Sequence, residues 1–134
     1  MAITSALEGG SAISDQLGMG HVIAGTITTG AGANAVLTCN DRSAVLTRNA
    51  TGDYTLTFGD TFTSAPVCVF TPMIVTFSTA ALFCVHIVSV TTAAVNFNLI
   101  KQSDTGTAAT TLSSINDGGA SDAVHFVIVG KRYN

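Results

Sequence analysis

Cys84 and His86 are the two side chains whose types and spacing best suit metal binding. Residues two apart in an extended segment project to the same side, so the thiol and the imidazole would be neighbours. Both groups are common zinc ligands, although a closed zinc site needs four. A homotrimer would present the pair three times around its axis, so one hypothesis is a metal bound on that axis. An unbroken apolar stripe explains both residues equally well, and we therefore predict neither a metal nor a cofactor.

Hydrolytic chemistry lacks a supporting motif. Serine, histidine and aspartate are all present, but no G-x-S-x-G sequence accompanies them. His21, His86 and His125 all lie in apolar segments typical of strands, where histidine is more often structural than catalytic. Glu8 is the only glutamate and the aspartates stand singly in or near turns, so no carboxylate pair for glycoside cleavage is visible. We predict that the protein is not an enzyme.

Cys39, Cys68 and Cys84 have spacings that match no zinc or redox motif. Two of them lie within apolar strand patterns, and a free cysteine behaves as a small hydrophobic residue. A chain made in a reducing cytosol rarely keeps a disulfide. We therefore predict buried, reduced thiols; one disulfide with one free thiol is the alternative.

The composition favours a homo-oligomer. The chain has 134 residues, enough for one domain, with 47% hydrophobic and only 10% charged residues, against about 25% charged residues in typical soluble domains. A monomer would have to cover itself with threonine, serine, asparagine and alanine while still exposing apolar strand faces. Assembly with other copies of the chain would hide part of that surface.

Charge and hydropathy exclude two classes of partner. A net charge of −3 with scattered lysines and arginines does not suit nucleic acid, which needs clustered positive charge. The longest apolar run, Ala80–Val90, is interrupted by His86 and Ser89 and is about half the ~20 residues of a membrane-spanning helix. The N-terminal segment has no basic region before its apolar residues, so it is not a secretory signal. We predict no membrane insertion.

Period-two alternation dominates the chain. Tyr54, Leu56 and Phe58 alternate with threonines, as in a strand with one buried face. Similar segments separated by turn residues predict strands at 21–29, 35–39, 43–49, 53–59, 67–77 with a break at Pro72, 80–91, 94–101 and 123–131. No segment is typical of a helix. The predicted fold is all-β, an antiparallel, jelly-roll-like β-sandwich without substantial helix.

Two of the expected strands are apolar on both faces. In the first, one side carries Leu82, Cys84, His86, Val88 and Val90, and the other carries Phe83, Val85 and Ile87. In the last strand, Val124, Phe126 and Ile128 lie opposite Val127 and Val129. One face of each strand can fill the core of the sandwich, so the other needs a partner.

Residues 1–20 are expected to form an N-terminal arm before a β-sandwich knob at 21–134. The arm is rich in glycine, serine and alanine and carries four isolated apolar residues that are candidates for partner attachment, Ile3, Leu7, Ile13 and Leu17. It either orders against a neighbouring subunit or host surface, or remains a frayed terminus. The polar segment Lys101–Gly119 is a candidate recognition loop, with a solvated connection as the alternative.

The segment Ala44–Pro66, AVLTRNATGDYTLTFGDTFTSAP, resembles the tip domains of bacteriophage tail fibres and related virion surface modules. The resemblance rests on a strand ending in Thr-Arg, a Gly-Asp-Tyr turn, a Thr-Phe pair and a Ser-Ala-Pro run. It extends more weakly from His21 to the C-terminus. It implies a virion structural protein, made in the host bacterial cytoplasm and located on the virion surface, and in such modules the partner is usually the same chain in a homotrimer.

Two roles within that group differ in reach. A tail-fibre protein usually carries a shaft before its tip, whereas the leader here spans at most ~70 Å when stretched. We therefore expect a capsid cement or decoration protein, a trimeric knob whose arms clamp the major capsid protein. The alternative is the receptor-binding tip of a tail fibre, held by another virion protein, with Gly30–Asn34 and Lys101–Gly119 touching a host surface receptor.

Overall fold

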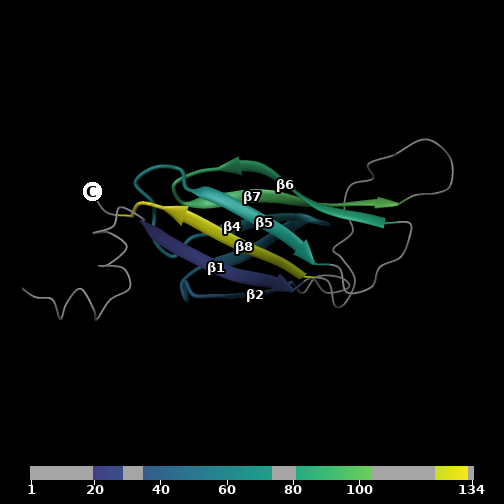
Figure 1. Ribbon diagram of the computed structural model, residues 1–134, viewed down its shortest axis with the longest axis horizontal. Coiled ribbons are helices and arrows are strands. Elements are labelled where there is room, and N and C mark those ends of the chain that lie inside the picture. The colour runs from purple at the N-terminus through teal and green to yellow at the C-terminus, as the bar shows by residue number, and fades with distance from the viewer. Residues whose placement is uncertain (1–19, 29–34, 74–80, 104–122, 133–134) are drawn as a thin grey trace, which may run out of the picture.

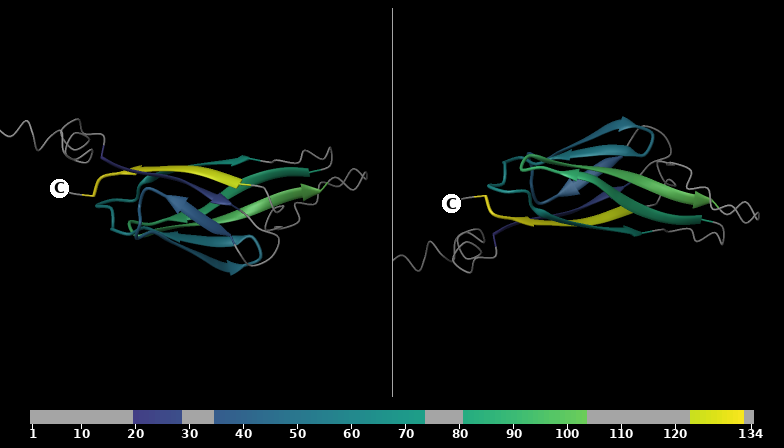
Figure 2. Two further views of the ribbon diagram at one scale, coloured as in Figure 1. Left: turned by 90° about the horizontal axis from the view of Figure 1, so that it is seen from below. Right: turned by 90° about the horizontal axis from the view of Figure 1, so that it is seen from above.

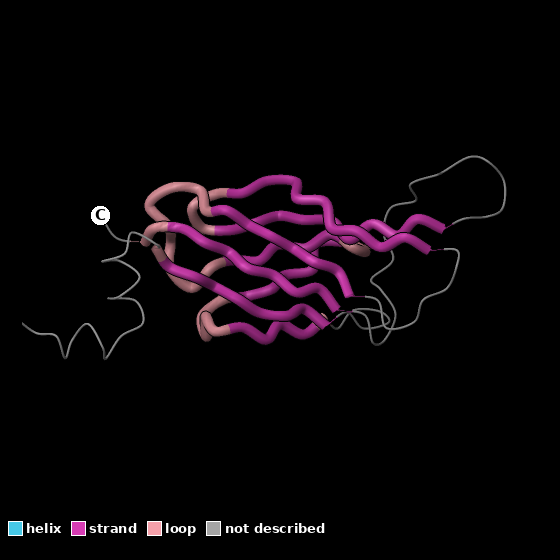
Figure 3. The backbone as a smooth tube through the Cα atoms, in the orientation of Figure 1, coloured by secondary structure: helices cyan, strands magenta, loops and turns pink. Residues whose placement is uncertain are grey.

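The computed structural model describes residues 20–28, 35–73, 81–103 and 123–132. This part of the chain forms eight strands and no helix (Figures 1 and 3). The strands are β1 (His21–Thr28), β2 (Val36–Cys39), β3 (Val45–Ala50), β4 (Asp53–Thr57), β5 (Val67–Met73), β6 (Ala81–Val90), β7 (Ala94–Ser103) and β8 (Ala123–Gly130). Each corresponds to a strand expected from the alternating pattern, so the all-β prediction is confirmed.

The strands form two four-stranded sheets. Sheet A has the order β2-β1-β8-β5 and sheet B the order β3-β4-β7-β6, and all neighbouring strands are antiparallel. The sheets stack as the two layers of a sandwich (Figure 2). The first and last strands are neighbours, with His21 opposite Gly130, so both ends of the knob lie at one end of the sandwich. This nesting of β1 beside β8 makes the fold jelly-roll-like.

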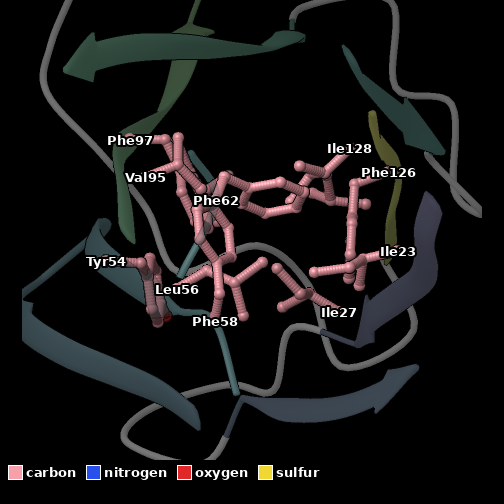
Figure 4. Packing of buried hydrophobic residues seen from close by; sticks show 12 residues of the cluster. Ile23, Ile27, Tyr54, Leu56, Phe58, Phe62, Val95, Phe97, Phe126 and Ile128 are labelled. Carbon is pink, nitrogen blue, oxygen red and sulfur yellow. The ribbon is translucent and has the colours of Figure 1, made fainter. Parts of the chain in front are cut away.

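Aromatic and branched side chains fill the space between the sheets (Figure 4). Tyr54 and Leu56 on β4 and Phe58 just after it are buried, as their alternation with threonines predicts. Phe97 on β7 is fully buried and stacks on Tyr54, with ring centroids 5.8 Å apart. Its ring also meets Phe70 from sheet A at 4.8 Å. Phe97 therefore joins the two layers of the core.

Pro72 does not break its strand, contrary to the expectation. Strand β5 continues through Pro72 to Met73, and Pro72 lies opposite Val124 of β8. Because β5 is an edge strand of sheet A, the hydrogen bond that proline cannot donate is needed on only one side. The sheet position therefore tolerates a residue that would end a central strand.

The expected face of β6 is wrong at its C-terminal end. The pairing with β7 shifts between Ile87 and Ser89, which is the mark of a β-bulge. Val90 consequently lies opposite the buried Val95 and packs against the core, instead of sharing the outer face with Cys84. The bulge also leaves Val88 exposed.

Gly20 joins the arm to the knob. Its φ of +68° favours glycine, and a Cβ at this position would lie 2.4 Å from the Gly130 carbonyl oxygen. The residue is buried against the end of β8. The chain therefore enters the knob at one fixed point beside its C-terminal strand.

A buried ion pair closes the same end of the sandwich. The Asp41 carboxylate, in the turn after β2, accepts a 2.8 Å hydrogen bond from an Arg132 Nη atom. It also accepts hydrogen bonds from the backbone N–H groups of Ser43 and Gly59. The Arg132 guanidinium lies over the Phe62 ring, 5.1 Å from its centroid. Asp41 thus ties the segment after β8 to two loops of the other sheet.

Acid should weaken this closure. Burial raises the pKa of Asp41, but the Arg132 guanidinium and the two backbone N–H groups outweigh burial and hold the pKa below its usual 3.8. As the pH falls, the unfolded chain therefore takes up this proton before the folded protein does. The stabilisation is complete above about pH 5 and is lost as the pH falls through the folded pKa.

Urea unfolding from pH 7 down to about pH 3 would measure this loss. Relative to the wild type, Asp41→Asn should show a flatter decline of the unfolding free energy at the acid end. Asp60→Asn is the control, because the Asp60 side chain is 74% exposed. Identical acid limbs for wild type and Asp41→Asn would contradict the assignment.

Candidate interaction surface

The structure does not gather the candidate metal ligands into a site. Cys84 and His86 lie in register opposite Ile100 and Asn98 of β7, where Cys84 is partly buried and His86 is exposed. Among the described residues, no group of three or more histidine, cysteine, aspartate or glutamate side chains could hold a metal ion. Each chain therefore offers these two ligands as a pair, on the outer face of sheet B.

The histidines lie in separate places. His86 is on the outer face of sheet B, whereas His125 is exposed on the outer face of sheet A, its Nδ1 3.1 Å from the Thr26 hydroxyl. His21 lies at the closed end of the sandwich, with its ring edge towards Phe62. The fold therefore does not combine them into one catalytic arrangement.

All three cysteines are free thiols and are partly buried. Cys39 and Cys68 pack against the core, and Cys84 lies on the outer face of sheet B. The prediction of reduced thiols agrees with this arrangement, although none is fully buried.

Cys68 should react slowly with alkylating reagents in the folded protein. Burial raises the pKa of its thiol from 9.0 to about 11, and the thiolate is the reactive form. At pH 8 the thiolate fraction should fall about 100-fold relative to the unfolded chain. Iodoacetamide labelling followed by peptide mass spectrometry, with and without urea, would measure the two rates. Equal rates would contradict the prediction.

The outer face of sheet B is polar. A chain of hydrogen bonds crosses all four strands: Asn49 donates to the Thr55 hydroxyl at 2.9 Å, Thr55 donates to Asn96 at 2.7 Å, and Asn96 donates to Ser89 at 2.9 Å. These amides and hydroxyls satisfy one another and remain compatible with water. This face therefore has no need of an apolar partner.

The outer face of sheet A is apolar. Its centre, here called the valine face, consists of two rows across β1, β8 and β5: Val22–Val129–Val67 and Ala24–Val127–Val69. The five valines are between 36% and 68% exposed. A third row, Thr26–His125–Thr71, borders them. Adjacent apolar side chains that are left open to water in this way mark an interaction surface.

The alternating pattern revealed only part of the valine face. Val127 and Val129 were expected on the face opposite the core, and both are exposed there. Val22, Val67 and Val69 were missed, although each alternates with a core-facing neighbour in its own strand. The signal was present within each strand, but the pattern does not say that β1, β8 and β5 are neighbours.

The other candidate contact residues are Ile3, Leu7, Ile13 and Leu17 of the arm, and they lie outside the described residues. The same is true of Gly30–Asn34 and of residues 104–119 of the expected loop, whereas β7 extends the loop's first residues as a strand to Ser103. In the part of the chain that the structure describes, no helix is long and apolar enough to cross a membrane.

Comparisons of the chain with protein-family models, with curated protein sequences and with solved structures gave no match. The fold and its two contrasting outer faces are therefore the basis for a functional assignment.

Proposed function

We propose that this protein is a non-enzymatic structural protein of a bacteriophage virion, a homotrimeric capsid cement or decoration protein attached through its N-terminal arm. The observation that carries the proposal is the uncharged, exposed valine face, set on a sandwich whose opposite face is polar and self-satisfied. The resemblance of Ala44–Pro66 to virion surface modules supplies the virion and the threefold symmetry. The partners are other copies of the chain and the major capsid protein.

The way the arm joins the knob suits such attachment. Gly20 is packed against Gly130, so the arm starts from a fixed point at the closed end of the sandwich. In a trimer three arms would bind at once, and avidity would compensate for weak individual contacts. A shallow, repeated contact of this kind needs neither a deep pocket nor catalytic groups.

The geometry of the two ends keeps a tail-fibre receptor-binding tip as the alternative. The knob begins and finishes at one end, while β1 ends, and β2 and β8 begin, at the other. Anchoring through the arm would leave that second end free to meet a host surface receptor. Figure 1 shows the two ends of the elongated sandwich.

Two measurements test the proposal. The mass of the purified protein in solution should be three times the 13.6 kDa of one chain, and a 13.6 kDa species would overturn the homotrimer. Cryo-electron microscopy of the virion should then show the knob on the capsid. Density confined to the tail would favour the receptor-binding tip, and turnover of cell-wall polysaccharide by the purified protein would overturn the non-enzymatic assignment.

A further inference from the structure

We propose that copies of this chain contact one another through the outer face of sheet A, with the valine face at the centre of the contact. This inference rests on the proposed homo-oligomer and assigns the surface that forms it. It commits to a second copy of the same chain as the occupant of the face.

The charge distribution favours a like partner. The four strands of sheet A contain no aspartate, glutamate, lysine or arginine. Two copies can therefore bring these faces together without burying an unpaired charge or opposing like charges. A partner selected by charge complementarity would find nothing to recognise here, whereas another uncharged valine face is complementary to it.

The shape of the face also suits stacking of one sheet on another. Val22, Val127 and Val69 project around the smaller Ala24 and leave a shallow step between two rows of valines. Sheets that pack face to face interdigitate such side chains about 10 Å apart. A valine from a second copy can fill the step.

The area of the face sets the scale of the contact. Four strands about 4.8 Å apart, the longest about 26 Å, give a backbone footprint on the order of 400 Å². A standard interface buries about 800 Å² per partner. The contact must therefore use most of the sheet face, and one charge near its centre should be enough to weaken it.

The assignment also separates this face from the metal hypothesis. Sheets A and B present their outer faces in opposite directions, as Figure 2 shows. If sheet A faces the axis of the oligomer, Cys84 and His86 of sheet B face away from it. A metal site built from this pair on the same axis is then geometrically excluded.

Two matched valines test the inference. Val69 on sheet A and Val45 on sheet B are both 56% exposed, and both lie on edge strands. Light scattering over a concentration series should show that Val69→Glu raises the dissociation constant at least 100-fold, while Val45→Glu leaves it unchanged. Circular dichroism would check that both variants remain folded.

The other outcomes are equally decisive. If neither variant changes the dissociation constant, or both do so equally, sheet A is not the contact, although an oligomeric wild type would leave the proposed function standing. A monomeric wild type would overturn the proposed homotrimer and this inference together.

A second pair of variants covers the case in which Val69→Glu does not fold. Val69→Thr/Val127→Thr keeps the branched shape that strands favour while removing apolar surface, and Val45→Thr/Val88→Thr is its counterpart on sheet B. The first pair should weaken association at least tenfold and the second should not. Equal effects of the two pairs would overturn the inference.

Discussion

Replacing Arg132 with alanine should lower the free energy of unfolding by about 3–5 kcal/mol, because it leaves a buried carboxylate without its counter-charge. The side chains of Arg132 and Asp41 are only 6% and 9% exposed, so water cannot take over the role of the guanidinium. The change also removes the cation from the face of the Phe62 ring. Urea unfolding at pH 7 and one fixed protein concentration would measure the loss, since oligomer stability depends on concentration.

Two controls separate the ion pair from the loss of side-chain volume. Asp60→Asn should change the stability by less than about 0.5 kcal/mol, because Asp60 is exposed and 3.5 Å from the guanidinium. The double variant Asp41→Asn/Arg132→Met should recover part of the loss, since no uncompensated charge remains buried. If Arg132→Ala unfolds at the same urea concentration as the wild type, the pair does not hold this end closed.

Replacing Phe97 with alanine should cost about 3–5 kcal/mol, the range found when a large aromatic residue is removed from a well-packed core. Phe97 contacts Tyr54 in its own sheet and Phe70 in the other. Its loss would open a cavity between the layers that two sheets tied by backbone hydrogen bonds cannot readily close.

Thermal and urea unfolding of Phe97→Ala would measure the cost at matched protein concentration. Thr57→Ala, on an exposed position of the neighbouring strand β4, is the control and should change the stability by less than about 1 kcal/mol. A similar loss for both variants would mean that Phe97 is not a central contact of the core.

The strands were predictable because their signal is local. Tyr54, Leu56 and Phe58 alternate with threonines, and such a pattern suits a half-buried strand wherever it lies in the sheet. The bulge in β6 was not predictable, since one extra residue reverses the face of Val90 without altering its apolar character. Pro72 was misjudged for a related reason, because its tolerance depends on β5 being an edge strand.

The candidate surface was only partly predictable, because it depends on which strands are neighbours. Val22, Val67 and Val129 are far apart in the sequence, and only the register of β1 and β5 on β8 places them in one row. Cys84 and His86, two residues apart, were easy to notice but lie on the opposite sheet. Adjacent residues in the chain attracted the chemical hypothesis, whereas the surface was assembled by tertiary pairing.

The central position of β8 also determines the order in which the protein can be made. Sheet A needs β8 between β1 and β5, so a ribosome must synthesise nearly the whole chain before the sandwich can close. Until then the edges of β1 and β5 stay unpaired, and such exposed edges promote aggregation. Val127 and Val129 arrive with the same strand, so a nascent chain cannot complete its valine face before its core, and assembly is delayed until the finished subunit has been released.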